Sequence, residues 1–276
     1  MSFDSGLYVV ATPIGNLADM SQRAIAILEA ADIVAVEDSR VTGKLLHHLG
    51  LKKKMRRYND HSSESDRLGL VAAARDGIVA LASDAGTPLI SDPGYKLVRS
   101  AREAGVTVYT APGPSAAIAA LSICGLPTDR FLFAGFLPSK AKARADALAE
   151  LAAIKATLVF YESGPRLAAT LAAIADVYGD REIAVARELT KKFEEVVTGS
   201  SSELAERYAE QEPKGEIVLI VGPPSEQILA ETGDVDSALR EALETMSAAK
   251  AAGAIAKRFG LERSDVYARA TAMKSK

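Results

Sequence analysis

Short apolar runs alternate with longer amphipathic segments through the first 124 residues of the chain. The runs are rich in Val, Ile and Ala and have the length of buried strands; they cover residues 6–11, 32–36, 78–82 and 106–110. Between them apolar side chains recur at helical spacing, as Ala24, Leu28 and Ala31 do after the first run. This alternation predicts a mainly parallel sheet with helices on both faces.

The pattern changes after a turn at residues 125–130. Further strands are predicted at residues 131–136, 157–161, 182–187, 194–198 and 216–221. Helices are predicted at residues 141–153, 165–177 and 201–210. Only residues 188–193 separate two of these strands, which favours a hairpin. The second half is therefore predicted to contain a mixed sheet, and a cleft between two unlike α/β halves is a common ligand site.

The end of the chain is basic in an otherwise acidic protein. Residues 245–276 hold seven lysines and arginines against two acids, a net charge of +5 in a chain whose total is −3. Two segments with helical spacing, separated by Gly260 and a possible cap at Ser264, resemble a helix-turn-helix module. The charge favours contact with RNA or DNA, and a helical tail docked on the core is the alternative.

These patterns divide the chain into three parts. Residues 1–124 are predicted to form an N-terminal parallel α/β domain, and residues 125–226 a C-terminal mixed α/β domain. Residues 227–276 are predicted to be a linker and a basic helical RNA-binding tail, and the acidic residues 230–244 within them are predicted to be part linker and part helix. The predicted fold class is therefore α/β, with two unlike domains and a small helical C-terminal module.

Composition narrows the class of protein. A hydrophobic share of 48% and a charged share of 25% are those of ordinary soluble proteins, and no apolar run approaches the roughly 20 residues that span a bilayer. The first residues lack the pattern of a secretion signal, and Cys124 is the only cysteine. We therefore expect a cytoplasmic protein without disulfides. Three histidines and one cysteine also argue against a metal site.

Polar turns follow three of the predicted strands, and the turn at residues 83–94 is the most unusual. It reads Ser-Asp-Ala-Gly-Thr-Pro-Leu-Ile-Ser-Asp-Pro-Gly and lies between a buried strand and a helix. Ligands of open α/β sheets bind at the carboxyl ends of strands, and Gly86 and Gly94 permit close approach of the backbone. A plain surface turn would need only three or four such residues, so we predict that this loop is functional.

The other turns carry weaker signals. Residues 12–19 contain one glycine where a dinucleotide fingerprint has three, which argues against a nicotinamide cofactor. Residues 37–40, Glu-Asp-Ser-Arg, are suited to a polar ligand, or Ser39 caps the following helix; both interpretations stay open. Residues 52–57 hold five cations in six positions, which is typical of a solvated loop and also suits nucleic-acid phosphates.

Taken together, these motifs resemble the tetrapyrrole methylase superfamily, the class III S-adenosylmethionine-dependent methyltransferases. The motifs at residues 11–19, 37–40, 83–94, 112–115 and 186–191 are similar to the 16S rRNA cytidine 2′-O-methyltransferase branch. Porphyrin and corrin members usually carry a Gly-Asp-Pro type sequence in the central loop. This chain has Ser83-Asp84-Ala85-Gly86 there, which favours the rRNA branch. The resemblance covers nearly the whole chain, including the basic tail.

The resemblance implies two α/β domains with S-adenosylmethionine folded in the cleft between them, and a homodimer. The residues that it implies for cofactor binding are Pro13, Asp84, Ala85, Gly86, Thr87, Ser115, Ala116 and Tyr161. Residues 160–162 and 216–218 of the second domain would close over the adenine. The backbone amides of Gly86 and Gly113, together with Asp84, are expected to serve the polar groups of the cofactor.

The activity that the resemblance implies is methylation of the ribose 2′-hydroxyl of a decoding-centre cytidine of 16S rRNA, in the 30S subunit. Positioning of the hydroxyl supplies about 7–11 kcal/mol in reactions of this kind. Glu188 is the candidate base, and Arg187 and Lys191 hold RNA phosphates or tune its charge; a structural ion-pair cluster is the alternative. Two rival functions stay open: a small-molecule tetrapyrrole methyltransferase, and an RNA-binding assembly factor without turnover.

Overall fold

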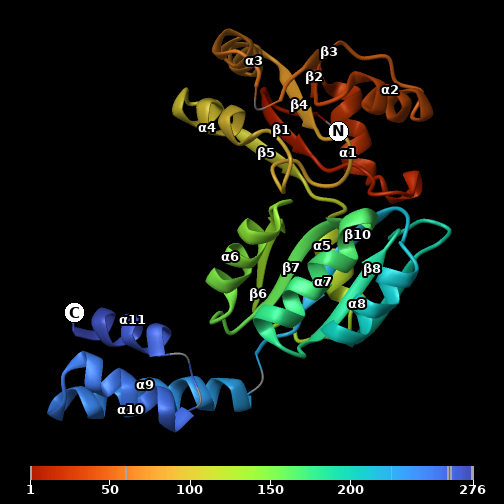
Figure 1. Cartoon of the computed structure of the whole chain (residues 1–276). Coiled ribbons are helices and arrows are strands. Elements are labelled where there is room, and N and C mark those ends of the chain that lie inside the picture. The colour runs from red at the N-terminus through yellow and green to blue at the C-terminus, as the bar shows by residue number, and fades with distance from the viewer. Residues whose placement is uncertain (1, 60, 225, 260, 262, 275–276) are drawn as a thin grey trace. The chain divides into compact units, whose positions relative to one another are not determined.

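The computed structural model describes residues 2–59, 61–224, 226–259, 261 and 263–274. It consists of two compact units, one ending at Pro223 and the other beginning at Pro224. The first unit holds two five-stranded sheets, and the second is helical (Figure 1). The division of the first unit into domains at residue 124, and the start of the tail at residue 227, stay predictions.

The first sheet is entirely parallel, as predicted, and its strands lie in the order β3-β2-β4-β1-β5. The strands are β1 (Gly6–Val10), β2 (Ile33–Val36), β3 (Met55–Arg57), β4 (Ile78–Ala82) and β5 (Val108–Ala111). The helices of this half are η1 (Leu17–Asp19), α1 (Gln22–Ala30), α2 (Ser39–His48), α3 (Glu64–Asp76) and α4 (Tyr95–Glu103). Helices α1 and α2 pack on one face of the sheet, and α3 and α4 on the other.

The second sheet is mixed and has the order β6-β7-β10-β8-β9. Its strands are β6 (Phe131–Phe136), β7 (Thr157–Ser163), β8 (Glu182–Arg187), β9 (Glu195–Ser200) and β10 (Glu216–Val221). Strands β6 and β7 are parallel and the other pairs antiparallel, which confirms the predicted β8–β9 hairpin. Helix α5 (Ala116–Ile123) covers one face. The opposite face is covered by α6 (Ala141–Leu151), α7 (Gly164–Tyr178) and α8 (Ser201–Glu210).

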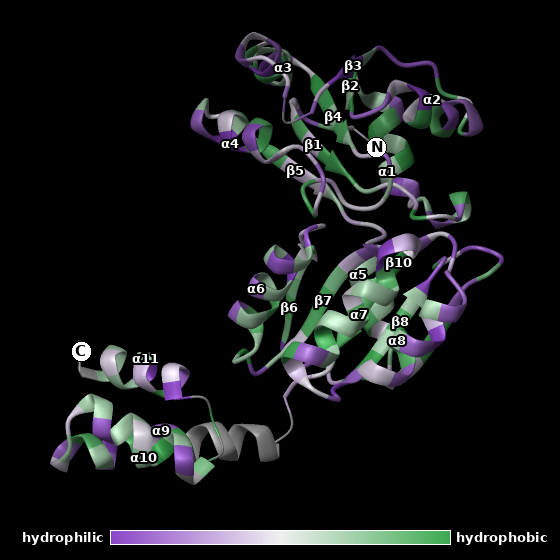
Figure 2. Ribbon diagram, viewed as in Figure 1, coloured by the Kyte–Doolittle hydropathy of each residue, from purple (hydrophilic) through white to green (hydrophobic). Residues whose placement is uncertain are grey.

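Burial of apolar strands between helical layers explains why these sequences form sheets. All four residues of β2 are buried, as are five of the six residues of β10. Strands covered on both faces read as continuous apolar runs, and Figure 2 shows the hydrophobic colour concentrated along the strands. Helix starts follow local capping: Ser63 accepts a hydrogen bond from the Asp66 N–H, and Ser200 forms a capping box with Glu203.

The basic segment at residues 52–57 is ordered by specific contacts. Met55–Arg57 form the edge strand β3 rather than the loop that we predicted, because they pair with Val34–Val36 of β2. The Lys53 ammonium donates to the carbonyl oxygens of Glu29 and Ala31 at the end of α1, where a cation is favourable. Lys53 therefore has a structural role. That the exposed cations of this segment contact RNA stays a prediction.

Two helix boundaries differ from the sequence prediction. Asp38, not Ser39, is the N-cap of α2; its carboxylate accepts from the Arg40 N–H, so the helix begins one residue earlier than a Ser39 cap requires. Ser264 lies inside the first turn of α11 (Arg263–Lys274) and does not precede it.

The second unit is a cluster of three helices: α9 (Glu226–Thr245), α10 (Ala248–Phe259) and α11. The acidic residues 230–244, predicted to be part linker and part helix, lie entirely within α9, so the helix part of the prediction is confirmed and the linker part is wrong. The physical reason is an apolar face on α9, where Val235 and Leu239 pack against Ala251 and Val266 of the following helices. None of the helices that the structure describes is both long and apolar enough to cross a membrane.

Candidate active site

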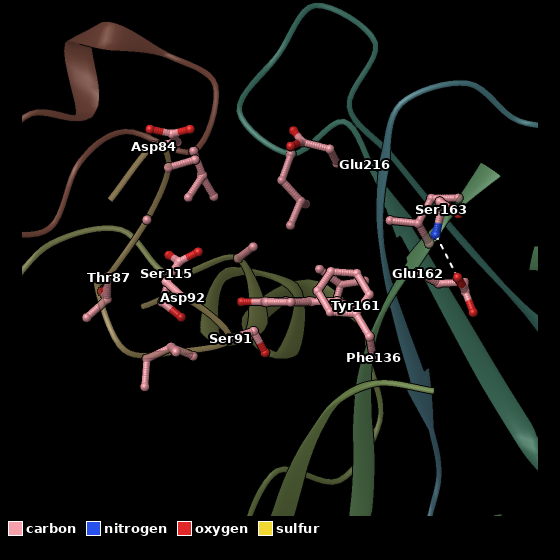
Figure 3. Close-up of a pocket in the computed structure, with 18 of the residues that line it drawn as sticks. Asp84, Thr87, Ser91, Asp92, Ser115, Phe136, Tyr161, Glu162, Ser163 and Glu216 are labelled. Carbon is pink, nitrogen blue, oxygen red and sulfur yellow. Dashed lines mark hydrogen bonds between the residues drawn. The ribbon is translucent and has the colours of Figure 1, made fainter. Parts of the chain in front are cut away.

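A cavity of about 450 Å³ lies in the first unit, where the polar turns that follow strands of the first sheet face the strand ends of the second sheet (Figure 3). The first sheet contributes residues that follow β1, β2, β4 and β5: Ile14, Glu37, Asp84, Ala85, Gly86, Thr87, Ile90, Ser91, Asp92, Ser115 and Ala116. The second contributes Phe136, Tyr161, Glu162, Ser163, Leu189, Gly215, Glu216, Ile217 and Val218. We predicted that a ligand binds at the carboxyl ends of the parallel strands, and the cavity lies there.

Thr12 fixes the central loop to the turn after β1. The Thr12 N–H donates to the Gly86 carbonyl oxygen at 2.8 Å, and the Gly86 N–H donates to the Thr12 carbonyl oxygen at 3.1 Å. Gly86 has a φ of 80°, and a Cβ there would lie 3.3 Å from Ile14 Cγ2. The expectation that the Gly86 amide serves a ligand is therefore wrong, because that amide is already used.

Gly113 also has a packing role. A Cβ at this position would lie 2.9 Å from Ala11 Cβ, which is closer than side-chain carbons approach one another. Gly113 is absent from the described residues that line the cavity. The glycine allows the Pro-Gly-Pro turn to pack on the end of β1, and this turn places Ser115 and Ala116 at the cavity wall.

Two residues of the central loop have strained backbones. Leu89 and Ser91 have φ values of 75° and 61°, in the left-handed region that side chains disfavour. Strain of this kind costs about 1–3 kcal/mol per residue and is concentrated at functional sites. Here it accompanies a chain path that places Ile90, Ser91 and Asp92 together at the cavity wall.

The cavity is acidic. Five acidic residues are among the described lining residues, namely Glu37, Asp84, Asp92, Glu162 and Glu216, and no lysine or arginine is. The Glu162 carboxylate itself is buried against Thr170 and Arg166 and is directed away from the cavity (Figure 3). Burial raises the pKa of Asp92 to about 6, and the nearby Glu37 and Asp84 add to the rise, whereas a hydrogen bond with Ser83 opposes it. Such a cavity favours a cationic ligand over an anionic one.

One wall of the cavity is apolar and aromatic. The Tyr161 ring lies edge-on to Phe133 and Phe136, with centroid distances of 4.9 and 5.5 Å. Burial raises the pKa of Tyr161, whose hydroxyl is hydrogen-bonded to Ser115 and to the Ala117 backbone. With Ile217, Val218 and Leu189 nearby in the lining, this wall is suited to a flat heteroaromatic ring.

Two family patterns match the chain. The pattern described as Tetrapyrrole (Corrin/Porphyrin) Methylases matches residues 6–205, which is most of the chain. The chain belongs to the tetrapyrrole methylase family. A second pattern, the RsmI C-terminal HTH domain, matches residues 230–274 and so covers the three helices of the second unit.

Curated relatives of this tetrapyrrole methylase share one name, ribosomal RNA small subunit methyltransferase I. The relative from Erythrobacter litoralis is 57% identical over 98% of this chain and 96% of its own length. The relative from Mesorhizobium japonicum is 48% identical over 98% of this chain and 93% of its own length. These matches confirm the predicted rRNA branch of the family.

Solved structures show the same fold at lower identity. Uroporphyrin-III-C-methyltransferase of Thermus thermophilus has a TM-score of 0.56 and 23% identity, covering 79% of this chain and 94% of that one. Diphthine synthase has a TM-score of 0.60 and 15% identity, covering 78% of this chain and 89% of that one. The predicted fold class, two α/β sheets of different kinds with C-terminal helices, is therefore confirmed.

Most of the residues predicted for cofactor binding by this tetrapyrrole methylase meet at the cavity. Asp84, Ala85, Gly86, Thr87, Ser115, Ala116 and Tyr161 all line it. Pro13 does not, although its neighbour Ile14 does. Phe160, expected near the adenine, is instead buried in the core beneath α7, since successive residues of a strand point to opposite faces. That these residues bind a cofactor stays a prediction.

The three residues predicted for catalysis form ion pairs at the end of β8, and none is among the described lining residues. Lys191 Nζ lies 2.8 Å from Glu188 Oε1 and 2.7 Å from Glu216 Oε2. The hydrogen bond from Lys191 lowers the pKa of Glu188. Arg187 Nη2 lies 2.9 Å from Glu195 Oε2. This geometry is that of a structural ion-pair cluster, the alternative to a catalytic role. The catalytic role of the three residues stays a prediction.

Glu188 supports the cavity wall from behind. Its Oε1 accepts a hydrogen bond from the Glu216 N–H at 3.2 Å, and a Cβ at Gly215 would lie 2.2 Å from the same oxygen. Gly215 and Glu216 both line the cavity.

Glu37, Asp92 and Phe136 line the cavity but were not among the individual residues predicted for cofactor binding. The first two stand in the motifs at residues 37–40 and 83–94, so their position after strand ends was the available signal.

Proposed function

We propose that this protein is an S-adenosylmethionine-dependent methyltransferase that methylates a ribose 2′-hydroxyl of 16S rRNA in the small ribosomal subunit. The observation that carries the proposal is the acidic cavity without a lysine or arginine among its described lining residues. S-adenosylmethionine has a sulfonium and an ammonium against a single carboxylate, so it is a net cation that this cavity favours. The name shared by the curated relatives supports rRNA as the substrate.

The residues present fit the cofactor. A cavity of about 450 Å³ lies within the roughly 300–1,000 Å³ typical of small-molecule sites. The apolar wall around Tyr161 suits adenine, and the hydroxyls of Thr87, Ser91 and Ser115 suit polar groups. We assign cofactor binding to Pro13, Asp84, Ala85, Gly86, Thr87, Ser115, Ala116 and Tyr161. Of these, Pro13 is not among the described lining residues, although its neighbour Ile14 is.

The bound cofactor supplies a methyl group on a positively charged sulfur, which is electrophilic without further activation. The protein then has three tasks: to orient the ribose hydroxyl, to exclude water, and to accept the hydroxyl proton. Positioning accounts for about 7–11 kcal/mol in well-oriented reactions, and the doubly hydrogen-bonded Thr12–Gly86 contact gives the loop the rigidity that positioning requires. The sequence alone predicted Glu188 as the proton acceptor, with Lys191 and Arg187 as its partners, but none of the three is among the described lining residues, and the pKa of Glu188 is lowered.

The helical second unit is proposed to contact the rRNA. Its described cations Lys250, Lys257, Arg263 and Arg269 are exposed, and the match of this unit to a helix-turn-helix domain supports the assignment. Lysines and arginines that neutralise phosphates give binding that weakens as salt is added. The decoding-centre cytidine is proposed as the target on the family resemblance alone, and the proposed ribosomal substrate supports a cytoplasmic location.

We propose that the protein forms a homodimer. Strand β6 is an edge of the second sheet, and Phe131 and Phe136 on it are 44% and 58% exposed. Ile118 and Ile123 on α5 are 53% and 49% exposed. Exposed apolar side chains of this size are common where a second copy packs, and light scattering of the purified protein measures the oligomeric state directly.

A radiolabelled-cofactor assay tests the proposed function. The protein is incubated with tritiated S-adenosylmethionine and, separately, 30S particles, naked 16S rRNA and a porphyrin. We expect label in the rRNA of the 30S particles. Label only on the porphyrin would support a tetrapyrrole methyltransferase, against which the acidic cavity argues because porphyrinoids carry several carboxylates. No label on any substrate would support the assembly factor.

A further inference from the structure

We propose that Asp92 is the residue that accepts the proton of the ribose 2′-hydroxyl during methyl transfer. The inference rests on the proposed function. It assigns one chemical step of that reaction to a residue that was not among the predicted catalytic or cofactor-binding residues. It is supported by the position of Asp92 in the cavity, by the groups that surround its carboxyl, and by the hydrogen bonds and ion pairs of other acids near the site.

Asp92 is held at the cavity wall by the structure of the central loop. It follows Ser91, whose strained backbone has a φ of 61°, and both residues line the cavity. A hydrogen bond with the largely buried Ser83 ties the Asp92 carboxyl to the end of β4. Figure 3 shows Asp92 beside Ser115, with the Tyr161 ring directed toward them from the second sheet. The carboxyl thus lies between the loop and the wall proposed for adenine.

The surroundings of Asp92 favour a carboxyl that takes up protons near neutral pH. Glu37 and Asp84 face it from the first sheet, and the Tyr161 phenol interacts with it from β7. Glu216 and Glu162 are the other acids of the described lining, which holds no lysine or arginine. The Glu216 carboxylate is paired with Lys191, and the Glu162 carboxylate is buried against Thr170 and Arg166. Burial and the neighbouring carboxylates raise the pKa of Asp92 to about 6. A general base works best when its pKa lies close to the working pH.

Four other acids near the cavity have specific hydrogen-bond or ion-pair partners. The Asp84 carboxylate accepts from the Asp38 N–H at 3.1 Å. Glu162 accepts from the Thr170 hydroxyl at 2.8 Å and pairs with Arg166 at 3.2 Å. Glu216 and Glu188 share Lys191.

The hydrogen bond from Lys191 lowers the pKa of Glu188 and so weakens that carboxylate as a base. Asp92 has the hydroxyl of Ser83 instead of a cation.

The step balances without a further reactant. The O–H bond of the ribose breaks and its proton passes to the Asp92 carboxylate. The oxygen lone pair forms the bond to the methyl carbon, and the carbon–sulfur bond breaks with its electrons going to sulfur, which leaves a neutral thioether. Solvent then takes the proton from Asp92.

The experiment compares Asp92→Asn with Glu188→Gln, Asp92→Glu and the control Asp76→Asn, an exposed acid at the end of α3. Methyl transfer to 30S particles is measured from pH 5 to 9, and S-adenosylmethionine binding by calorimetry. For Asp92→Asn we expect kcat to fall by about 10²–10⁴-fold, with cofactor affinity within about threefold of wild type. The fall of wild-type kcat/KM below about pH 6 should disappear in this variant.

Glu188→Gln and Asp76→Asn are expected to keep the acidic limb of the profile, and Asp92→Glu to recover part of the rate. Two results would overturn the inference: full activity of Asp92→Asn, or a loss of cofactor affinity that matches the loss of activity, which would make Asp92 a partner of the cofactor ammonium. A wild-type protein that does not methylate 30S rRNA would instead remove the proposed function, and this inference with it.

Discussion

Thr12 and Gly86 form a pair of backbone hydrogen bonds, 2.8 and 3.1 Å long, at the carboxyl ends of the strands of the first sheet. The pair is an isolated antiparallel bridge between turns that follow two different strands. Because Gly86 lines the cavity, this bridge fixes one cavity wall to the end of β1. The rigidity that the proposed reaction needs therefore comes from backbone pairing in a loop.

Gly86→Val is expected to abolish binding of S-adenosylmethionine. The new side chain would meet Ile14 and extend into the cavity wall, at a φ of 80° that a branched residue disfavours. Gly105→Val is the matched control, because Gly105 has a φ of 72° but nothing within 4 Å of its Cβ position. Both variants should lose about 1–3 kcal/mol of stability, and calorimetry should show lost binding only for Gly86→Val. Unchanged affinity in that variant would contradict the site assignment.

Asp84→Asn is expected to weaken S-adenosylmethionine more than S-adenosylhomocysteine. The Asn oxygen can still accept from the Asp38 N–H, so the substitution removes the charge and little else. We expect the affinity for the cationic cofactor to fall about tenfold, or about 1.4 kcal/mol, and the affinity for the neutral thioether product much less. Titration of both ligands into both proteins measures the difference. Equal losses would mean that the cavity charge does not recognise the sulfonium.

Much of the fold and the rim of the site could be predicted from the sequence, because the signals are local. Apolar runs with β-branched residues predicted most strands, and the polar turns that follow them predicted the cavity rim. Ser63 and Ser200 stand where helices begin, and they cap them. These signals depend on residues a few positions apart.

The rest depended on partners distant in the sequence. The Gly86 amide is used by Thr12, and Lys53 is bound to the end of α1. The acidic composition of residues 230–244 suggested a linker, although the apolar face of α9, with Val235 and Leu239, is covered by two later helices. The raised pKa of Asp92 likewise depends on burial and, to a smaller extent, on Glu37, which follows another strand.

Stability should depend on the ionisation of Asp92 between about pH 4 and pH 6. The pKa of this carboxyl is about 6 in the folded protein, against an ordinary value of 3.8. Between these values the folded chain holds a proton that the unfolded chain has released, so this group makes stability fall as pH rises. The Asp92→Asn variant does not lose this contribution. The melting temperature of the variant minus that of wild type should therefore be larger at pH 7 than at pH 4. A constant difference between the two proteins would contradict the raised pKa.

Removal of the second unit should separate cofactor binding from RNA binding. A chain that ends at Pro223 keeps the whole first unit, whereas a cut at Thr245 would leave the apolar face of α9 uncovered. We expect the shortened protein to bind S-adenosylmethionine normally and 16S rRNA more weakly, with a shallower dependence on salt.

Replacement of Lys250, Lys257 and Arg263 by Gln is the control that keeps this unit folded, since all three side chains are exposed. It should reproduce the loss of rRNA binding. Equal rRNA affinity with and without the unit would refute its role.

The central claim is that the acidic cavity between the two sheets holds the methyl donor, and a crystal structure of the protein soaked with S-adenosylmethionine tests it most directly. The account predicts adenosine density against Tyr161 and Val218, with the methionine part near Asp84. Density for the cofactor elsewhere on the protein, or a cavity closed by its own side chains at saturating cofactor, would contradict it.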